Sequence, residues 1–204
     1  MATAPPGRAP GELAPRPSRV VPVLARVLLG VLGAALLGGC RGNGGGTGLD
    51  LVLPEGVGRR VELVPRSAFA EYVELPDLRR ELRITLANYE LGCERYVPPG
   101  PGELLFVLTI ATPEKEPIAV GTVPSGGAPA PDAGPLPRKT AFAVARQGDR
   151  GFDFPNGGSV ELSSVDLSTS GRVNGVLALE FPGDGTRPAA GAHGKFEARM
   201  CRGE

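Results

Sequence analysis

Residues 103–110 read Glu103-Leu104-Leu105-Phe106-Val107-Leu108-Thr109-Ile110. The run is apolar at both odd and even positions, and a strand buried on both faces has this pattern. The preceding run, residues 81–89, instead alternates: Leu82, Ile84 and Leu86 share one face, and Glu81, Arg83 and Thr85 share the other. Alternation of this kind indicates a strand with one face buried. We therefore expect a β-sheet whose central strand is residues 103–110.

Further runs with a period of two residues flank this pair. Residues separated by two positions share a face of a strand, and Gly, Pro, Asp and Asn between the runs favour turns. The sequence predicts strands at residues 59–64, 140–145, 159–167, 172–181 and 195–201, and a short helix around Asp77 within 67–82. The pattern predicts an all-β domain, an antiparallel β-sandwich of about eight strands, with a closed β-barrel as the alternative.

Residues 122–137 are rich in Pro, Gly and Ala. Proline lacks the amide hydrogen that a ladder needs, and glycine adds no core contact. We expect this stretch to be an exposed low-complexity loop between two strands, and functional contacts are often carried by such loops.

Composition limits the function. The chain has 204 residues, with 22 Lys and Arg against 22 Asp and Glu, so it lacks the basic excess typical of nucleic-acid binding. Aromatic residues make up 5%, too few for an extended stacking platform. One histidine excludes zinc sites built from two or three histidines. We expect no cofactor, no metal and no nucleic-acid partner.

The first part of the chain is typical of a secretory signal. Four arginines precede a short apolar run, residues 27–37, which ends in Gly38-Gly39-Cys40. A positive leader, an apolar centre and small residues at the exit are the parts of a signal peptide. The alternative is a transmembrane anchor over residues 20–39, which would place Arg26 in the hydrocarbon at a cost of about 3 kcal/mol.

Residues Leu37-Gly38-Gly39-Cys40 resemble the lipobox of bacterial lipoproteins. The resemblance implies removal of residues 1–39 as a signal peptide and attachment of acyl chains, such as palmitate, through Cys40. Several chains hold a protein on a membrane stably, whereas one does so only marginally. Residues 40–48 are glycine-rich and are expected to be the lipidated cysteine and a flexible tether. The β-domain then covers residues 49–204.

Two further cysteines remain, Cys93 and Cys201. An even number of cysteines in an oxidising compartment favours a disulfide. We expect a Cys93–Cys201 bond, with two free thiols or a metal pair as the alternatives.

Several residues could carry chemistry, but each has a simpler structural explanation. His193 is expected in an exposed turn before the last strand, and Asp153 and Asp184 are expected in turns. A catalytic histidine would need a nucleophile and an orienting acid, and a calcium site would need more oxygen ligands than these turns offer. Glu161, Asp166 and Glu180 could form a carboxylate pair for glycoside hydrolysis, although solvent-facing strand positions explain Glu161 and Glu180 without any chemistry.

The C-terminal quarter resembles uncharacterised lipoproteins of myxobacteria. The similar segments are residues 158–168, 171–181 and 194–201, which repeat glycine-punctuated strands and finish near a cysteine. The resemblance implies no activity.

Together these observations predict a lipid-anchored protein of the bacterial cell envelope, held in the outer membrane. We expect a non-enzymatic binding or scaffold module whose partners are the membrane, through its anchor, and an envelope protein or polysaccharide. The alternative is a small envelope hydrolase that uses an acid pair.

Overall fold

The computed structural model describes residues 47–201 except 56–57, 76–78, 114–115, 127–135, 155–156, 185 and 187. Every regular element in these ranges is a strand, so the predicted all-β class is confirmed. The strands are β1 (Gly48–Leu53), β2 (Arg59–Leu63), β3 (Ser67–Glu74), β4 (Arg80–Ala87), β5 (Leu104–Thr112), β6 (Gly121–Pro124), β7 (Thr140–Gln147), β8 (Arg150–Asp153), β9 (Gly158–Val165), β10 (Arg172–Phe181) and β11 (Ala190–Met200).

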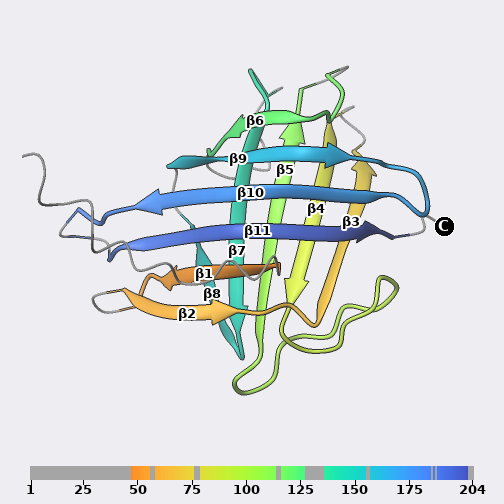
Figure 1. Cartoon of the computed structure of the whole chain (residues 1–204). Helices are drawn as coiled ribbons and strands as arrows, with labels where there is room; N and C mark the ends of the chain where they lie inside the picture. The colour runs from red at the N-terminus through yellow and green to blue at the C-terminus, as the bar shows by residue number, and fades with distance from the viewer. Residues whose placement is uncertain are drawn as a thin grey trace, which may run out of the picture. The chain divides into compact units, whose positions relative to one another are not determined.

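The strands form one curled sheet with the order β6-β9-β10-β11-β3-β4-β5-β7-β8. Strand β1 adds to β11 and carries β2 on its other side. Neighbours pair antiparallel except β11 and β3, which are parallel over a short ladder at Arg199 and Met200. In Figure 1, strands β1, β2, β6, β9, β10 and β11 run across the view, and β3, β4, β5, β7 and β8 cross behind them.

The main core draws on both sets of strands. The inward faces of β4, β5 and β7 contribute from the crossing strands behind. The inward faces of β1, β9, β10 and β11 contribute from the strands in front. Leu82, Ile84 and Leu86 are buried here, as their alternation predicted, but Glu81 and Thr85 on the opposite face of the strand are buried as well. Phe106 of β5 is fully buried, and its ring meets Phe154 edge-on at a centroid distance of 5.6 Å.

Strand β5 is central, as its composition indicated. It pairs with β4 on one side and β7 on the other over most of its length. Leu105 and Thr109, on the face away from the main core, are also buried. A second layer of contacts therefore covers the outer face of this strand.

Three local expectations differ from the structure. Most of the segment 67–82, which was expected to hold a short helix around Asp77, belongs to β3 and β4, and residues 76–78 lie outside the described ranges. The stretch 122–137 is not entirely a loop, because Gly121–Pro124 pairs with β9. Proline is tolerated there because it ends an edge strand, and Val123 is buried against the core. The described residues form eleven strands rather than about eight, because β1, β3, β6 and β8 were not predicted, and β6 and β8 have only four residues each.

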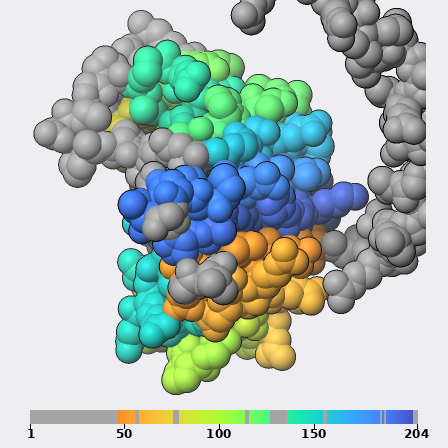
Figure 2. All heavy atoms as spheres, turned by 90° about the vertical axis from the view of Figure 1, so that its left-hand side faces the viewer, coloured from red at the N-terminus to blue at the C-terminus, as the bar shows by residue number. Residues whose placement is uncertain are grey.

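The β1–β2 hairpin lies beside β10 and β11 and meets the turn between β7 and β8 (Figure 2). Glu55 accepts from Arg59 at 2.8 Å and also pairs with Arg150. Arg59 in turn donates to Gln147. These polar contacts join the front and crossing strands at this end. Strand β1 begins at Gly48, the last residue of the expected tether, and residues 40–46 lie outside the described part of the chain.

Gly175 of β10 lies where both β9 and β11 approach closely. The register of β9 against β10 shifts between Asn174 and Gly175. A methyl group at Gly175 would lie 2.5 Å from the carbonyl oxygen of Glu161 and 2.6 Å from Cζ of Phe196. A side chain at this position must therefore displace the backbone of β9.

We expect Gly175→Ala to lower the free energy of unfolding by about 1–3 kcal/mol, the usual cost of overpacking. The matched control is Gly151→Ala in β8, where an added methyl meets nothing within 4 Å. Urea unfolding of both variants provides the comparison. Equal stability of the two would contradict the close approach at Gly175.

Candidate functional site

The loop of residues 88–103 between β4 and β5 is held by side-chain hydrogen bonds. Asn88 Oδ1 accepts from the amide of Leu104 at 2.7 Å. Ser67 Oγ donates to the carbonyl of Tyr89 at 2.9 Å and accepts from the amide of Leu91 at 2.8 Å. The Tyr89 hydroxyl donates to the carbonyl of Val97 at 2.7 Å. Both halves of the loop are therefore fixed to the sheet or to each other.

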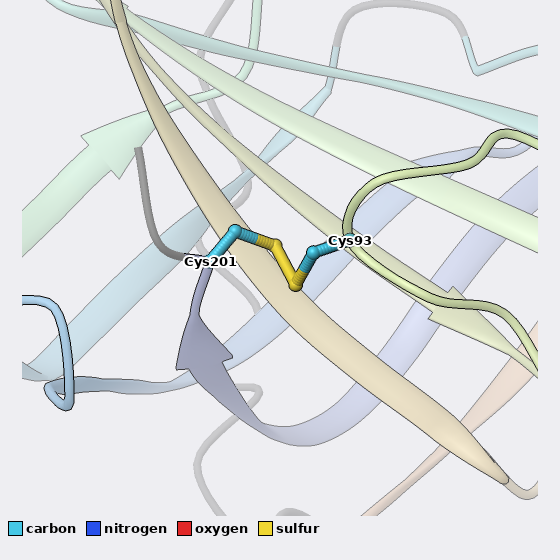
Figure 3. The surroundings of a disulfide bond; sticks show 2 residues. All are labelled: Cys93 and Cys201. Carbon is cyan, nitrogen blue, oxygen red and sulfur yellow. A yellow bond between two sulfur atoms is a disulfide. The ribbon is translucent and has the colours of Figure 1, made fainter. Parts of the chain in front are cut away.

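A disulfide joins this loop to the residue that follows β11. Figure 3 shows the bond from Cys93 of the loop to Cys201, the pair that the cysteine count predicted. Their Cα atoms are 5.6 Å apart, and 108 positions separate them in sequence. The amide of Cys201 donates to the carbonyl of Ala70 in β3 at 2.8 Å. The disulfide thus attaches the loop to the junction of β11 and β3.

Beneath the loop lies a second apolar cluster, on the outer face of β3, β4 and β5. We call it the outer cluster, and its buried members are Phe69, Ala87, Tyr89, Leu91 and Leu105. The two disulfide cysteines and Val107 pack against it. Burial raises the pKa of the Tyr89 hydroxyl above its usual value, with smaller contributions from Tyr96 and Glu103. The phenol is thereby kept neutral as a hydrogen-bond donor to Val97.

An open depression of about 340 Å³ lies next to the outer cluster. Tyr96, Leu105, Val107, Val144 and Arg146 line it, and we call it the Tyr96 depression. Val107 of β5 lies opposite Val144 of β7, and Leu105 lies opposite Arg146. Two cross-strand pairs therefore form the floor and one side, and the loop contributes Tyr96.

The polar groups of the depression are connected to each other. Arg146 Nη1 donates to the hydroxyl oxygen of Tyr96 at 3.1 Å. Both side chains are exposed, and Tyr96 is 58% accessible. Arg146 is the one charged residue among those that line the depression. The depression therefore combines an apolar floor with a cationic, hydrogen-bonding edge.

His193 lies within β11 and not in the expected turn, because the backbones of β10 and β1 pair with it from both sides. Its Nε2 is 3.3 Å from Glu180 Oε1, and both side chains are accessible to solvent. An accessible pair of this kind contributes little to stability. No serine, threonine or cysteine completes a catalytic set with it in the described contacts.

Asp153 ends strand β8, opposite Val144, where a turn was expected. Strand β8, which pairs with β7, was not predicted from the sequence. Asp184 follows β10 and lies outside any strand, and its Oδ1 accepts from the amide of Thr186 at 3.0 Å. In the described residues, no group of three or more His, Cys, Asp or Glu side chains is placed to hold a metal ion.

The three candidate carboxylates are not brought together. Glu161 lies opposite Val176, four positions from Glu180, which corresponds to about 13 Å along a strand. Asp166 follows β9, accepts from the amide of Ser168 at 3.0 Å, and has its pKa lowered by that bond. A glycosidase pair needs carboxyl groups roughly 5–9.5 Å apart. The strand register therefore gives no support to an acid pair among these residues.

Two predictions fall on residues beyond the described part of the chain. Cys40 and its preceding apolar run belong to residues 1–46. Within the described ranges, none of the secondary structure is a helix of the length and apolarity needed to cross a bilayer.

Sequence reasoning did not single out Tyr96 or Arg146. They are 50 positions apart, and each belongs to a segment with its own local explanation, a loop and a strand. The nearest signal was Cys93, whose expected bond implied that the surrounding loop was fixed. Comparison of the chain with family models, with curated proteins and with solved structures finds no match.

Proposed function

We propose that this chain is a bacterial lipoprotein, anchored through Cys40 in the outer membrane of the cell envelope, whose β-domain is a non-enzymatic binding module. The observation that carries the proposal is the sequence Leu37-Gly38-Gly39-Cys40 after an arginine-containing leader and an apolar run. A glycine-rich segment then separates Cys40 from the first strand, β1.

The disulfide supports an envelope location. Disulfides persist in oxidising compartments and are rare in the cytosol of most bacteria. The bond joins the two cysteines that would remain once Cys40 carries lipid. The short segment between Cys40 and Gly48 would reach at most about 28 Å when fully extended, so the domain would stay near the bilayer.

The Tyr96 depression supports binding rather than hydrolysis. None of the side chains that line it is a carboxylate, a histidine, a serine or a cysteine, and its one hydroxyl, that of Tyr96, accepts a hydrogen bond from Arg146. The partner we propose is an envelope protein or polysaccharide.

We also infer that the curled sheet is a two-layer sandwich, with the layers meeting where β11 pairs with β3. The main core lies between side chains from both sets of strands, as a sandwich requires. A closed barrel would need a continuous ladder from β6 to β7. In the described residues a single bridge, Ser125 with Ala141, links them.

The experiment is the intact mass of the full-length product purified from bacterial membranes, measured with and without reductant. We expect the mass of residues 40–204 plus an acylated glycerol, increasing by two hydrogens on reduction. The control is Cys40→Ala, which should keep residues 1–39 and carry no lipid. A wild-type mass that includes residues 1–39, or that lacks lipid, would overturn the anchor. A mass unchanged by reductant would overturn only the disulfide.

A further inference from the structure

We infer that the Tyr96 depression binds a small organic anion, an apolar body that ends in a carboxylate. The inference extends the proposed binding function by giving the chemistry of the ligand. It does not depend on lipid at Cys40, because every residue that carries it lies in the described β-domain.

The floor of the depression selects an apolar body. Leu105 is 2% exposed, and Val107 and Val144 are half-buried neighbours across β5 and β7. A ligand that covers the two valines removes apolar surface from water, which is favourable. The volume of about 340 Å³ is at the small end of ligand pockets. The apolar body is therefore the size of a single ring or a short chain.

The edge of the depression selects an anionic acceptor. A guanidinium has five N–H donors and no acceptor. Arg146 uses one of them on the oxygen of Tyr96, so the tyrosine hydroxyl keeps its own proton to donate. Both groups therefore present donors toward a ligand. A carboxylate accepts from two donors at once, and a charged acceptor makes the bond to arginine stronger.

The positive charge of Arg146 is not neutralised by any acid of the described structure. In the described part of the chain, several arginines are paired with acids, for example Arg150 with Glu55 and Arg172 with Glu197. The hydrogen bond that Arg146 makes there is to the neutral Tyr96, and no described carboxylate pairs with it. A ligand carboxylate would form with Arg146 the kind of ion pair that these other arginines form with acids of the protein.

The site is held in place before a ligand arrives. Tyr96 precedes Val97, whose carbonyl accepts from Tyr89, and follows Arg95, which bridges to Gly92 next to the disulfide. The valines and Arg146 lie on two paired strands. Fixing the binding residues in advance reduces the entropy lost on binding.

The test uses the whole chain, labelled with ¹³C at Leu and Val methyl groups. It is placed in phosphatidylcholine nanodiscs where Cys40 carries lipid and in plain buffer where it does not. Three probes are titrated: 3-phenylpropionate, 3-phenylpropan-1-ol with the same body and no charge, and acetate with the charge and no body. We expect 3-phenylpropionate to shift the methyls of Leu105, Val107 and Val144 saturably, with a Kd of about 1 mM. The methyls of Leu177, in the main core, should not move.

Two variants test whether Arg146 and Tyr96, at the edge of the depression, bind the carboxylate. Arg146→Gln removes the charge and should raise the Kd about tenfold, and Tyr96→Phe should raise it about threefold. Arg60→Gln, at an exposed position on β2, is the matched control and should leave the Kd unchanged. Unaltered Leu177 methyl signals show that each variant is folded.

Several results would overturn the inference: no saturable shift with 3-phenylpropionate, equal Kd for the alcohol, equal Kd for acetate, or equal effects of Arg146→Gln and Arg60→Gln. The intact-mass experiment tests the anchor separately. A failed anchor with an intact titration, or the reverse, therefore identifies which proposal is wrong.

Discussion

Replacing Cys93 and Cys201 together by alanine is expected to lower the free energy of unfolding by about 4 kcal/mol. The bond closes a loop in which the two cysteines are 108 positions apart, and a cross-link of this span is worth roughly 4.7 kcal/mol in the chain-entropy model. Removing the bond acts chiefly on the unfolded chain, because the unfolded chain then gains the conformations that the cross-link had excluded and its free energy falls. Urea unfolding followed by circular dichroism at 25 °C measures it.

Two controls accompany this variant. Reducing the wild-type protein should reproduce most of the loss, because it breaks the same bond without changing the sequence. Cys40→Ala should leave the unfolding curve unchanged, because Cys40 lies outside the β-domain. A double variant within about 1 kcal/mol of wild type would show that the loop and the sheet are joined as firmly without the bond.

The second large effect is expected at Phe106. Truncation to alanine should cost about 3–5 kcal/mol, because it empties a fully buried position in the main core and removes the edge-on contact with Phe154. Most natural domains are stable by only about 5–15 kcal/mol, so this variant is expected to unfold at much lower urea concentration.

Phe106→Leu keeps most of the apolar volume, so it should lose less than half as much stability as Phe106→Ala. It provides a measurable variant if Phe106→Ala is too unstable to fold. Val176→Ala on β10 is the exposed control, because Val176 is 39% accessible, and it should change stability by less than about 0.5 kcal/mol. A Phe106→Ala variant as stable as Val176→Ala would contradict the placement of Phe106 in the core.

The strands that sequence reasoning located best are those with their own periodic signal. Strand β10 has the bounds that were expected, 172–181, and β5 begins within one residue of the expected start. In both, the apolar residues that the pattern singled out, such as Val173 and Leu177 of β10 and Leu108 of β5, are buried, so local pattern and final environment coincide.

The first half of β11 shows why other strands could not be located. Ala190, Gly191, Ala192 and Gly194 have little preference for a strand, and the expected strand began only at Lys195. They become extended because β10 and β1 bond to them from both sides. Small side chains also suit a backbone enclosed in this way. The information that makes these residues a strand lies in distant segments, which a local pattern does not contain.

The Tyr96 depression was unpredictable for a related reason. The cysteine count indicated that Cys93 would be tied to Cys201, and it is. The cysteine count did not indicate which face of the sheet the loop would cover. Only the register of β5 against β7 brings Arg146 next to Leu105, and only the path of the loop brings Tyr96 to Arg146.

Strand β11 bonds to β10, β1 and β3, and therefore to strands made at the beginning and at the end of the sequence. Until ribosomes have added residues 190–200, the hairpin β1–β2 has no sheet to join and β3 has no link to β10. An unfinished chain therefore keeps its early strands unpaired with their final neighbours. Export of the kind that we propose passes the chain unfolded, and this order of synthesis would keep the sheet unassembled until its last strand has been made.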